Sequence, residues 1–157
     1  MLAVSCGAAM AASGNSATGA GAAAGTVVAP IILKHTAGAV LNFGTVTVGS
    51  TGGAIVVTSG GVGTPVGTVA FVPGSTVSAD AFTVTGDANR AYSITTGAGS
   101  VTAGSASMVF ATTPSVSQTT LGATGTGTFT VGGSLAVGSN TTPGAYTGTY
   151  TVTVAYD

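Results

Sequence analysis

From Thr26 onward, apolar and polar residues alternate with a period of two, the spacing of strands that bury one face. Val, Thr, Ile, Phe and Tyr dominate these runs, while Gly, Pro, Ser and Asn interrupt them at short intervals. This pattern predicts an all-β domain, and no part of it predicts a helix. The expected strands are Thr26–Lys34, Asn42–Val48, Gly53–Thr58, Gly67–Val72, Ala81–Thr85, Ala91–Thr95, Ser107–Ala111, Gly125–Val131, Ser134–Val137 and Tyr146–Tyr156.

Two of these strands are separated only by the polar segment Gly86-Asp87-Ala88-Asn89. The first carries Phe82 and Val84 on one face, and the second carries its own aromatic and aliphatic residues on one face. Because Asp and Asn side chains bond to their local backbone, they favour a chain reversal here. The segment therefore predicts a β-hairpin or a tight β-corner.

The last strand has the cleanest alternation of the chain, and Pro143-Gly144 marks a turn before it. This alternation is typical of an antiparallel sheet with one packed face. We expect the packed face to hold Tyr146, Tyr150, Val152, Val154 and Tyr156, and the opposite face to hold Thr147, Thr149, Thr151 and Thr153.

Composition excludes most kinds of chemistry. The 157 residues include two Lys or Arg, three Asp or Glu, one His and one Cys, so 3% are charged, against about 25% in ordinary soluble domains. General acid–base catalysis and nucleic-acid binding need more ionisable groups than this. We therefore expect no catalytic residues, cofactor, metal or nucleic-acid partner. A net charge of −1 also removes the repulsion that keeps proteins apart, which favours association.

Residues 1–12, MLAVSCGAAMAA, are small and apolar and end in an A-x-A pattern. They predict the remnant of a secretory leader, and the alternative is a flexible N-terminus. The single cysteine, Cys6, lies inside this segment, so the mature chain would have no disulfide. No run is long enough to span a membrane. The chain thus divides into a leader (1–12), a Gly/Ala-rich extension (13–25) and a β-sandwich domain (26–157).

The extension has no bulky residue and cannot fold by itself. It is either a flexible linker or a strand given to a neighbouring molecule. As an extended strand, one of its faces is regular and carries only small or β-branched side chains. That face consists of Thr18, Ala20, Ala22, Ala24, Thr26 and Val28.

The few polar residues of the body are expected to serve turns and surfaces. Lys34 and His35 predict a surface pair at a strand end, since no second ligand accompanies the histidine. Asp80, Asp87 and Asn89 could be imagined as calcium ligands, but they supply too few oxygens, so turn chemistry is favoured.

Three stretches together resemble a known group of proteins. They are residues 28–33 with 41–46, residues 82–89 with 92–94, and residues 143–154. In this order they look like a family of short, secreted proteobacterial β-sandwich proteins of unknown function. That family is similar to the spore-coat-protein-U domain and to Csu-type (archaic chaperone–usher) pilins, and the resemblance spans residues 17–156.

The resemblance implies an immunoglobulin-like antiparallel sandwich that lacks a strand. In such pilins the N-terminal extension of the next subunit fills the gap, with a periplasmic chaperone and an outer-membrane usher assisting export. Here residues 13–25 would be donated and the acceptor groove would lie beside Tyr146–Tyr156. The chain departs from the pilin pattern in having no cysteine pair and no large anchoring side chains in the extension.

The sequence thus predicts a non-enzymatic subunit of an extracellular fibre, pilus or coat, exported through the periplasm and acting in adhesion or scaffolding. Its main partner would be copies of itself, joined head to tail. One alternative is a monomeric secreted binding module that presents the Thr-rich face to a sugar or to ice. Another is a monomer whose own N-terminus folds back as a strand.

Overall fold

The computed structural model describes residue 14 and residues 18–157, and within them it has strands and no helix. The predicted leader lies outside the described residues. Within the described part there is no helix long and apolar enough to cross a membrane. The strands are β1 (Ile32–His35), β2 (Val46–Val57), β3 (Gly63–Phe71), β4 (Asp80–Thr85), β5 (Ala91–Thr96), β6 (Gly99–Ala103), β7 (Ala106–Pro114), β8 (Gln118–Thr120), β9 (Thr126–Val137), β10 (Thr147–Thr149) and β11 (Val152–Tyr156).

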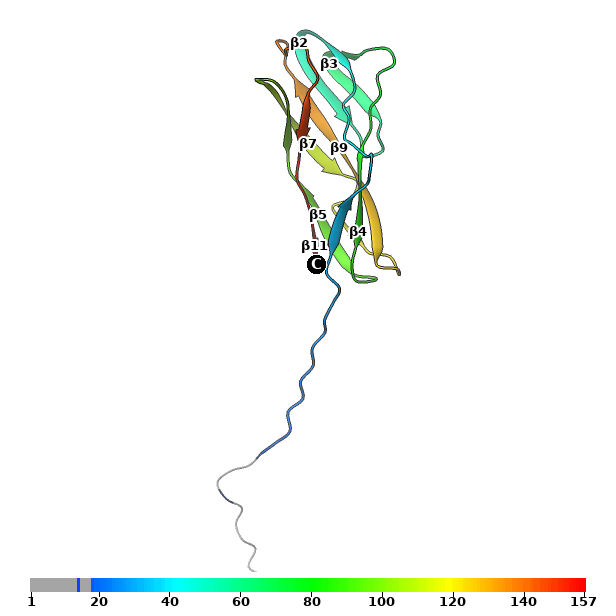
Figure 1. Ribbon diagram of the computed structural model, residues 1–157, viewed down its shortest axis with the longest axis vertical. Coiled ribbons are helices and arrows are strands. Elements are labelled where there is room, and N and C mark those ends of the chain that lie inside the picture. The colour runs from blue at the N-terminus through cyan, green and yellow to red at the C-terminus, as the bar shows by residue number, and fades with distance from the viewer. Residues whose placement is uncertain (1–13, 15–17) are drawn as a thin grey trace, which may run out of the picture.

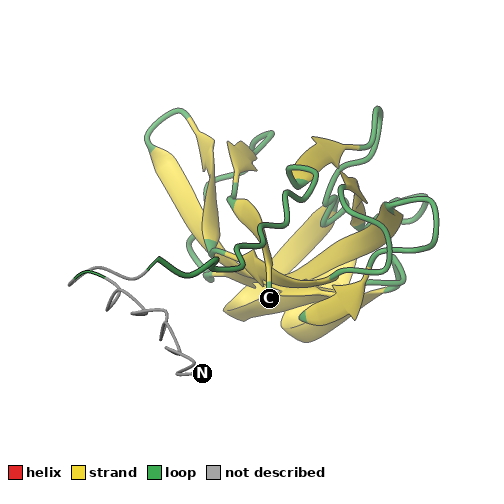
Figure 2. Cartoon of the chain, turned by 90° about the horizontal axis from the view of Figure 1, so that it is seen from below, coloured by secondary structure: helices red, strands yellow, loops and turns green. Residues whose placement is uncertain are grey.

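The strands form two antiparallel sheets (Figure 1). The larger sheet has eight strands and curls into a half-barrel, which Figure 2 shows from below. The smaller sheet has the order β11-β5-β8. The prediction of an all-β fold is confirmed, and so is a sandwich-like arrangement of two sheets. The specific immunoglobulin-like arrangement is not confirmed.

Strand β9 is the centre of the larger sheet. Its first half, Thr126–Val131, pairs with β4, and its second half, Gly133–Val137, pairs with β2. The sequence predicted two strands here because Gly132-Gly133 reads as a break, and that division is wrong. Both glycines are buried where β2 and β7 approach closely, so a side chain at either would collide with neighbouring backbone.

Strand β2 is also continuous where two strands, Asn42–Val48 and Gly53–Thr58, were predicted. The pairing register with β3 shifts between Val48 and Gly53, which marks a β-bulge. Gly52 has a φ of 69°, a conformation that glycine adopts without strain. A turn-like composition here produces an irregularity within one strand.

The last predicted strand, Tyr146–Tyr156, is divided in the structure. Its first part, β10, pairs with β6 in the larger sheet, and its second part, β11, pairs with β5 in the smaller sheet. Between them Tyr150 and Thr151 carry the chain from one sheet to the other. The expected alternation persists through the crossing: Tyr150 is half-buried and Thr151 is exposed. Because the period is unbroken, it gave no sign of the change of sheet.

The segment between β4 and β5 is a corner and not a hairpin, because β4 lies in the larger sheet and β5 in the smaller one. Asn89 turns the chain with a φ of 57°. Phe82 and Val84 of β4 face Tyr92 of β5 within one buried cluster. The predicted sharing of faces is therefore confirmed.

The structure also differs from the prediction at β6, β8 and β1. Strands β6 and β8 were not predicted, because β6 follows a glycine-rich stretch and β8 has only three residues. The predicted strand Thr26–Lys34 pairs only from Ile32 onward, where β1 meets β4. Apolar alternation before Ile32 does not lead to sheet pairing among the described residues.

The core consists of two apolar clusters. The first lies inside the half-barrel, where Phe43 and Phe110 meet edge to face at 5.5 Å. The second lies between the two sheets and contains Phe82 stacked on Phe129 at 5.3 Å. Tyr150 packs against both clusters, so the crossing between β10 and β11 joins the two halves of the core.

Tyr92 brings a polar hydroxyl group into the cluster between the two sheets. The side chain is fully buried, and burial raises the pKa of its hydroxyl. The hydroxyl has no hydrogen-bond partner within the part of the chain that the structure describes. A buried polar group without a partner carries its full desolvation cost.

The variant Tyr92→Phe is therefore expected to raise the free energy of unfolding by about 1 kcal/mol, measured by urea denaturation. The matched control is Tyr150→Phe, which removes a hydroxyl that donates to Asp80 at 2.8 Å. This control should lower the free energy of unfolding by about 2 kcal/mol. If Tyr92→Phe lowered the free energy of unfolding as much as Tyr150→Phe does, the Tyr92 hydroxyl would have to have a hydrogen-bond partner, and the prediction would be contradicted.

Candidate functional site

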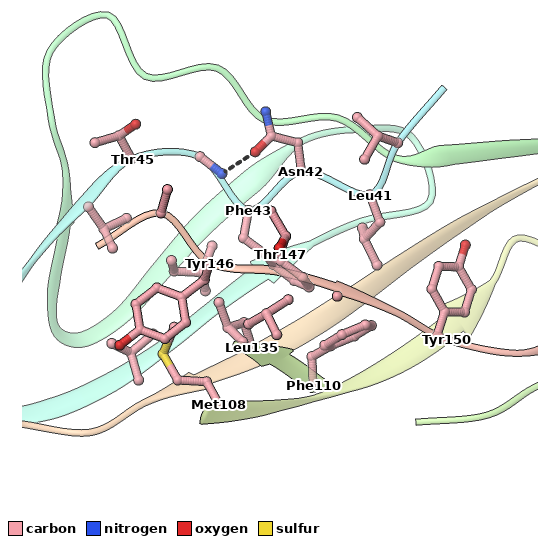
Figure 3. Close-up of a pocket in the computed structure, with 18 of the residues that line it drawn as sticks. Leu41, Asn42, Phe43, Thr45, Met108, Phe110, Leu135, Tyr146, Thr147 and Tyr150 are labelled. Carbon is pink, nitrogen blue, oxygen red and sulfur yellow. Dashed lines mark hydrogen bonds between the residues drawn. The ribbon is translucent and has the colours of Figure 1, made fainter. Parts of the chain in front are cut away.

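A groove with a volume of about 1450 Å³ opens into the half-barrel. Its floor is apolar and includes Ile55, Phe110, Leu135 and Val137, all of them buried core residues. One wall is formed by residues 39–48, and the other by residues 141–150. Figure 3 shows Tyr146 and Tyr150 toward the two sides of the view, with Leu135 and Phe110 beneath the segment that joins them.

Each wall ends in a strand edge with no ladder partner among the described residues. In one wall, Val46–Val48 of β2 pair with β3 on one side, whereas β9 reaches only Gly53–Val57 of the same strand. In the other wall, β10 stands last in its sheet and, in the part of the chain that the structure describes, pairs with β6 alone. The groove is therefore a gap between two open edges, each of which can template a further strand.

A polar cluster forms part of the lining of this groove. The His35 Nε2 atom lies 2.6 Å from Asp80 Oδ1, and the Tyr150 hydroxyl donates to Asp80 Oδ2 at 2.8 Å. The backbone N–H of Ala81 also donates to Oδ1, at 2.8 Å. The Asp80 side chain is buried, while half of the His35 side chain is exposed. Through these hydrogen bonds, Asp80 of β4 connects His35 of β1 with Tyr150, which lies between β10 and β11.

The environment of Tyr150 stabilises the neutral phenol. Burial raises the pKa of its hydroxyl, and the hydrogen bond to Asp80 and the charge of that carboxylate raise it further. Tyr150 therefore acts as a permanent hydrogen-bond donor. Among the described residues, the side-chain partner of His35 is Asp80, and no Ser or Cys bonds to it.

The predicted groove residues lie in two places. Tyr146, Tyr150 and Val152 line the groove, whereas Val154 and Tyr156 pack against the cluster between the two sheets. All five predicted side chains therefore face inward, but only Tyr146, Tyr150 and Val152 meet the groove.

The predicted donor residues form a tail outside the sandwich. Thr18, Ala20, Ala22, Ala24 and Thr26 are exposed, and Val28 is half-buried. None of them belongs to a strand. Figure 1 shows this tail leaving the domain beside the C-terminus and continuing away from it.

The row of threonines on the last segment does not lie on one sheet. Thr147 and Thr149 belong to β10 and Thr153 to β11, with Thr151 in the crossing between them. All four are exposed. The face proposed for sugar or ice is thus interrupted by the change of sheet, so it is not a single flat surface.

Comparison with known families gives one match. Residues 33–156 match the family described as "Domain of unknown function (DUF4402)". The chain belongs to the DUF4402 family. Searches of curated proteins and of solved structures found no match. The DUF4402 match begins within β1, so the tail precedes the matched residues.

The two aspartates that were considered as calcium ligands, Asp80 and Asp87, have different surroundings in the DUF4402 domain. Asp87 lies in the corner after β4, 4.0 Å from Arg90, and both side chains are partly exposed, so the pair contributes little stability. Within the described residues, no group of three or more His, Cys, Asp or Glu side chains could hold a metal ion. The role expected of Asp80 in a turn is wrong, since it pairs with His35.

A signal in the sequence could have placed Asp80 in the core. It shares the phase of Phe82 and Val84, so period two assigns all three to the inward face of the DUF4402 sandwich. Its partners lie 45 and 70 residues away in sequence, and no local pattern identifies them. His35 was predicted as a surface residue. Half of its side chain is exposed, but its ring also contacts the buried carboxylate of Asp80.

Proposed function

We propose that this protein is a non-enzymatic structural subunit that assembles head to tail by inserting its N-terminal tail, residues 18–28, into the groove of another copy. The observation that carries the proposal is the groove between two open strand edges, combined with an extended tail in the same chain. Strand addition to an open edge forms main-chain hydrogen bonds and buries apolar side chains.

Charge supports the tail as the occupant. Residues 36–79 and 91–156, which contain both groove walls, have no Lys, Arg, Asp or Glu. Burying a charge against such walls would cost free energy without compensation. Residues 18–28 are also uncharged, so the tail can enter without that cost.

The topology supports one direction of insertion. Each step in the series β2, β9, β7, β6 and β10 is antiparallel, so β2 and β10 run in the same direction. A strand placed between them is therefore antiparallel to both or parallel to both. The antiparallel choice completes a closed barrel without a parallel pair, and antiparallel pairing is slightly more stable per residue.

The position of the tail supports a second copy as the donor. The chain in β10 and β11 runs toward the end of the domain where the C-terminus and the root of the tail lie (Figure 1). The chain's own tail enters the groove from that end and runs parallel to β10. A tail from another copy enters from the opposite end and runs antiparallel. Repetition of this contact produces an open fibre.

The remaining parts of the proposal concern the setting of the fibre. We propose that it forms outside the cell after export through the periplasm, with a chaperone and an usher as partners, and that it acts in adhesion or scaffolding. The near absence of charge supports this setting, because an uncharged surface favours association over dispersal.

A cysteine scan tests the insertion. In chains carrying Cys6→Ser, single cysteines are placed from Thr18 to Val28 and mixed with a Thr149→Cys chain, whose substituted residue lies on the exposed face of β10. Cross-strand neighbours lie within disulfide reach. We expect linked pairs only at outward-facing tail positions, the odd-numbered ones, with the yield highest at one of them. Gel electrophoresis without reductant measures the yield.

The pattern of linkage separates insertion from random collision. Equal linkage at odd and even tail positions would contradict strand pairing. Persistence of oligomers without any linkage would show that assembly uses another surface. The matched control is Thr113→Cys, an exposed residue on β7 away from the groove, which should link to no tail position.

A further inference from the structure

The root of the tail is fixed to the domain by one hydroxyl group. The Tyr156 hydroxyl donates to the carbonyl oxygen of Ala29 at 2.9 Å, and it accepts the backbone N–H of Asp87 at 2.7 Å. The guanidinium carbon of Arg90 lies 5.2 Å from the centre of the Tyr156 ring. One side chain therefore joins the tail, the C-terminal strand and the corner that follows β4.

The boundary between tail and domain is sharp at this point. Ile31 packs against the cluster between the sheets, whereas Val27 is 99% exposed. Pro30 stands between them and restricts Ala29 to extended conformations. The contacts with the domain thus end at Ala29, and the tail before it points away from the sandwich (Figure 1).

We infer that Tyr156 determines which groove the tail enters, by holding the tail root pointed away from the groove of its own domain. This inference rests on the proposed function and adds a specificity residue to it. Insertion of the tail into its own groove requires a reversal before β1. Pro30 excludes Ala29 from that reversal, and the bond from Tyr156 to the Ala29 carbonyl holds the root in the outward direction.

This role is separate from the groove itself. Tyr156 does not line the groove and packs against the other cluster, so its hydroxyl contributes nothing to the acceptor surface. Removing the hydroxyl is therefore expected to leave the groove intact. It would free the tail to sample directions that lead back to its own domain, and so raise the share of self-inserted monomers.

The test uses Tyr156→Phe in the full chain with Cys6→Ser. The ring, and with it the contact to Arg90, is retained. Spin labels at Val27→Cys and Thr113→Cys report the distance between tail and domain by pulsed electron resonance, with excess unlabelled protein to suppress contacts between labels of different copies. The matched control is Ser93→Ala, which removes a hydroxyl that donates to Ala155 in the same small sheet but does not touch the tail.

For Tyr156→Phe we expect the distance distribution to broaden toward shorter values. The ratio of monomer to oligomer on size-exclusion chromatography should rise about fivefold, the effect of one hydrogen bond. Ser93→Ala should change neither quantity. An unchanged distribution and ratio for Tyr156→Phe would overturn the inference while leaving the proposed function intact. If the wild type forms no oligomers, the proposed function fails, and the distance distribution still decides the role of Tyr156.

A second variant keeps the test decisive if Tyr156→Phe folds poorly. Pro30→Gly relaxes the tail root without altering the buried clusters or the Tyr156 side chain. It should shift both measurements in the same direction as Tyr156→Phe. A tail root that is as ordered in Pro30→Gly as in the wild type would contradict the inference.

Discussion

A chain that starts at Ala29 is expected to remain monomeric at concentrations where the full chain forms oligomers. Residues 18–28 would add about ten main-chain hydrogen bonds to a neighbouring copy, each with a net value of ~1 kcal/mol. Losing them should weaken association by more than roughly 100-fold, which corresponds to ~3 kcal/mol. Analytical ultracentrifugation of the two proteins across a range of concentrations measures the change.

A control separates the loss of pairing from the loss of mass. Replacing Ala20, Ala22 and Ala24 by proline keeps the length and neutrality of the tail but removes three amide donors. This variant should be as monomeric as the shortened chain. A free peptide of residues 18–28 should bind to the shortened chain. Oligomers of unchanged size in both variants would show that the tail is not the connecting strand.

Substitution of Asp80 by alanine is expected to have the largest effect on stability of any change to a charged residue. It leaves the Tyr150 hydroxyl and the Ala81 N–H without their acceptor in a buried setting. The free energy of unfolding should fall by about 3 kcal/mol, because each such group costs 1–3 kcal/mol when left unpaired. Thermal denaturation followed by circular dichroism should show a midpoint lower by roughly 10 °C.

Asp87→Ala is the matched control for this variant. Its carboxylate is partly exposed and lies 4.0 Å from Arg90, so its removal should change stability by less than about 0.5 kcal/mol. A similar loss in the two variants would indicate a general effect of charge. A negligible loss for Asp80→Ala alone would contradict the structural role of the cluster with His35.

Period-two alternation was sufficient to predict the class of fold and the inward faces of the strands. Phe82, Val84, Tyr150 and Tyr156 face the core as their phase requires. Alternation is a local property, so it could not indicate which sheet a strand joins. The change of sheet at Tyr150 leaves the pattern intact, and for this reason β10 and β11 were predicted as one strand.

Glycine caused the opposite kind of error. Gly132-Gly133 and the segment around Gly52 read as breaks, because glycine is common in turns. In the structure the first pair permits close strand contacts, and Gly52 forms part of a bulge. The groove could be anticipated only as a region beside the last strand. Its other wall, residues 39–48, comes from a distant part of the sequence.

The direction in which the tail leaves the domain has a mechanical consequence for a fibre built by insertion. The tail continues away from the domain beside the C-terminus (Figure 1), and an inserted strand would lie alongside β10, the last strand of its sheet. Tension between successive copies would then act parallel to the paired strands, in shear. All the bonds of the joint would share the load together, so such a fibre would resist pulling far better than one whose strands peel apart bond by bond.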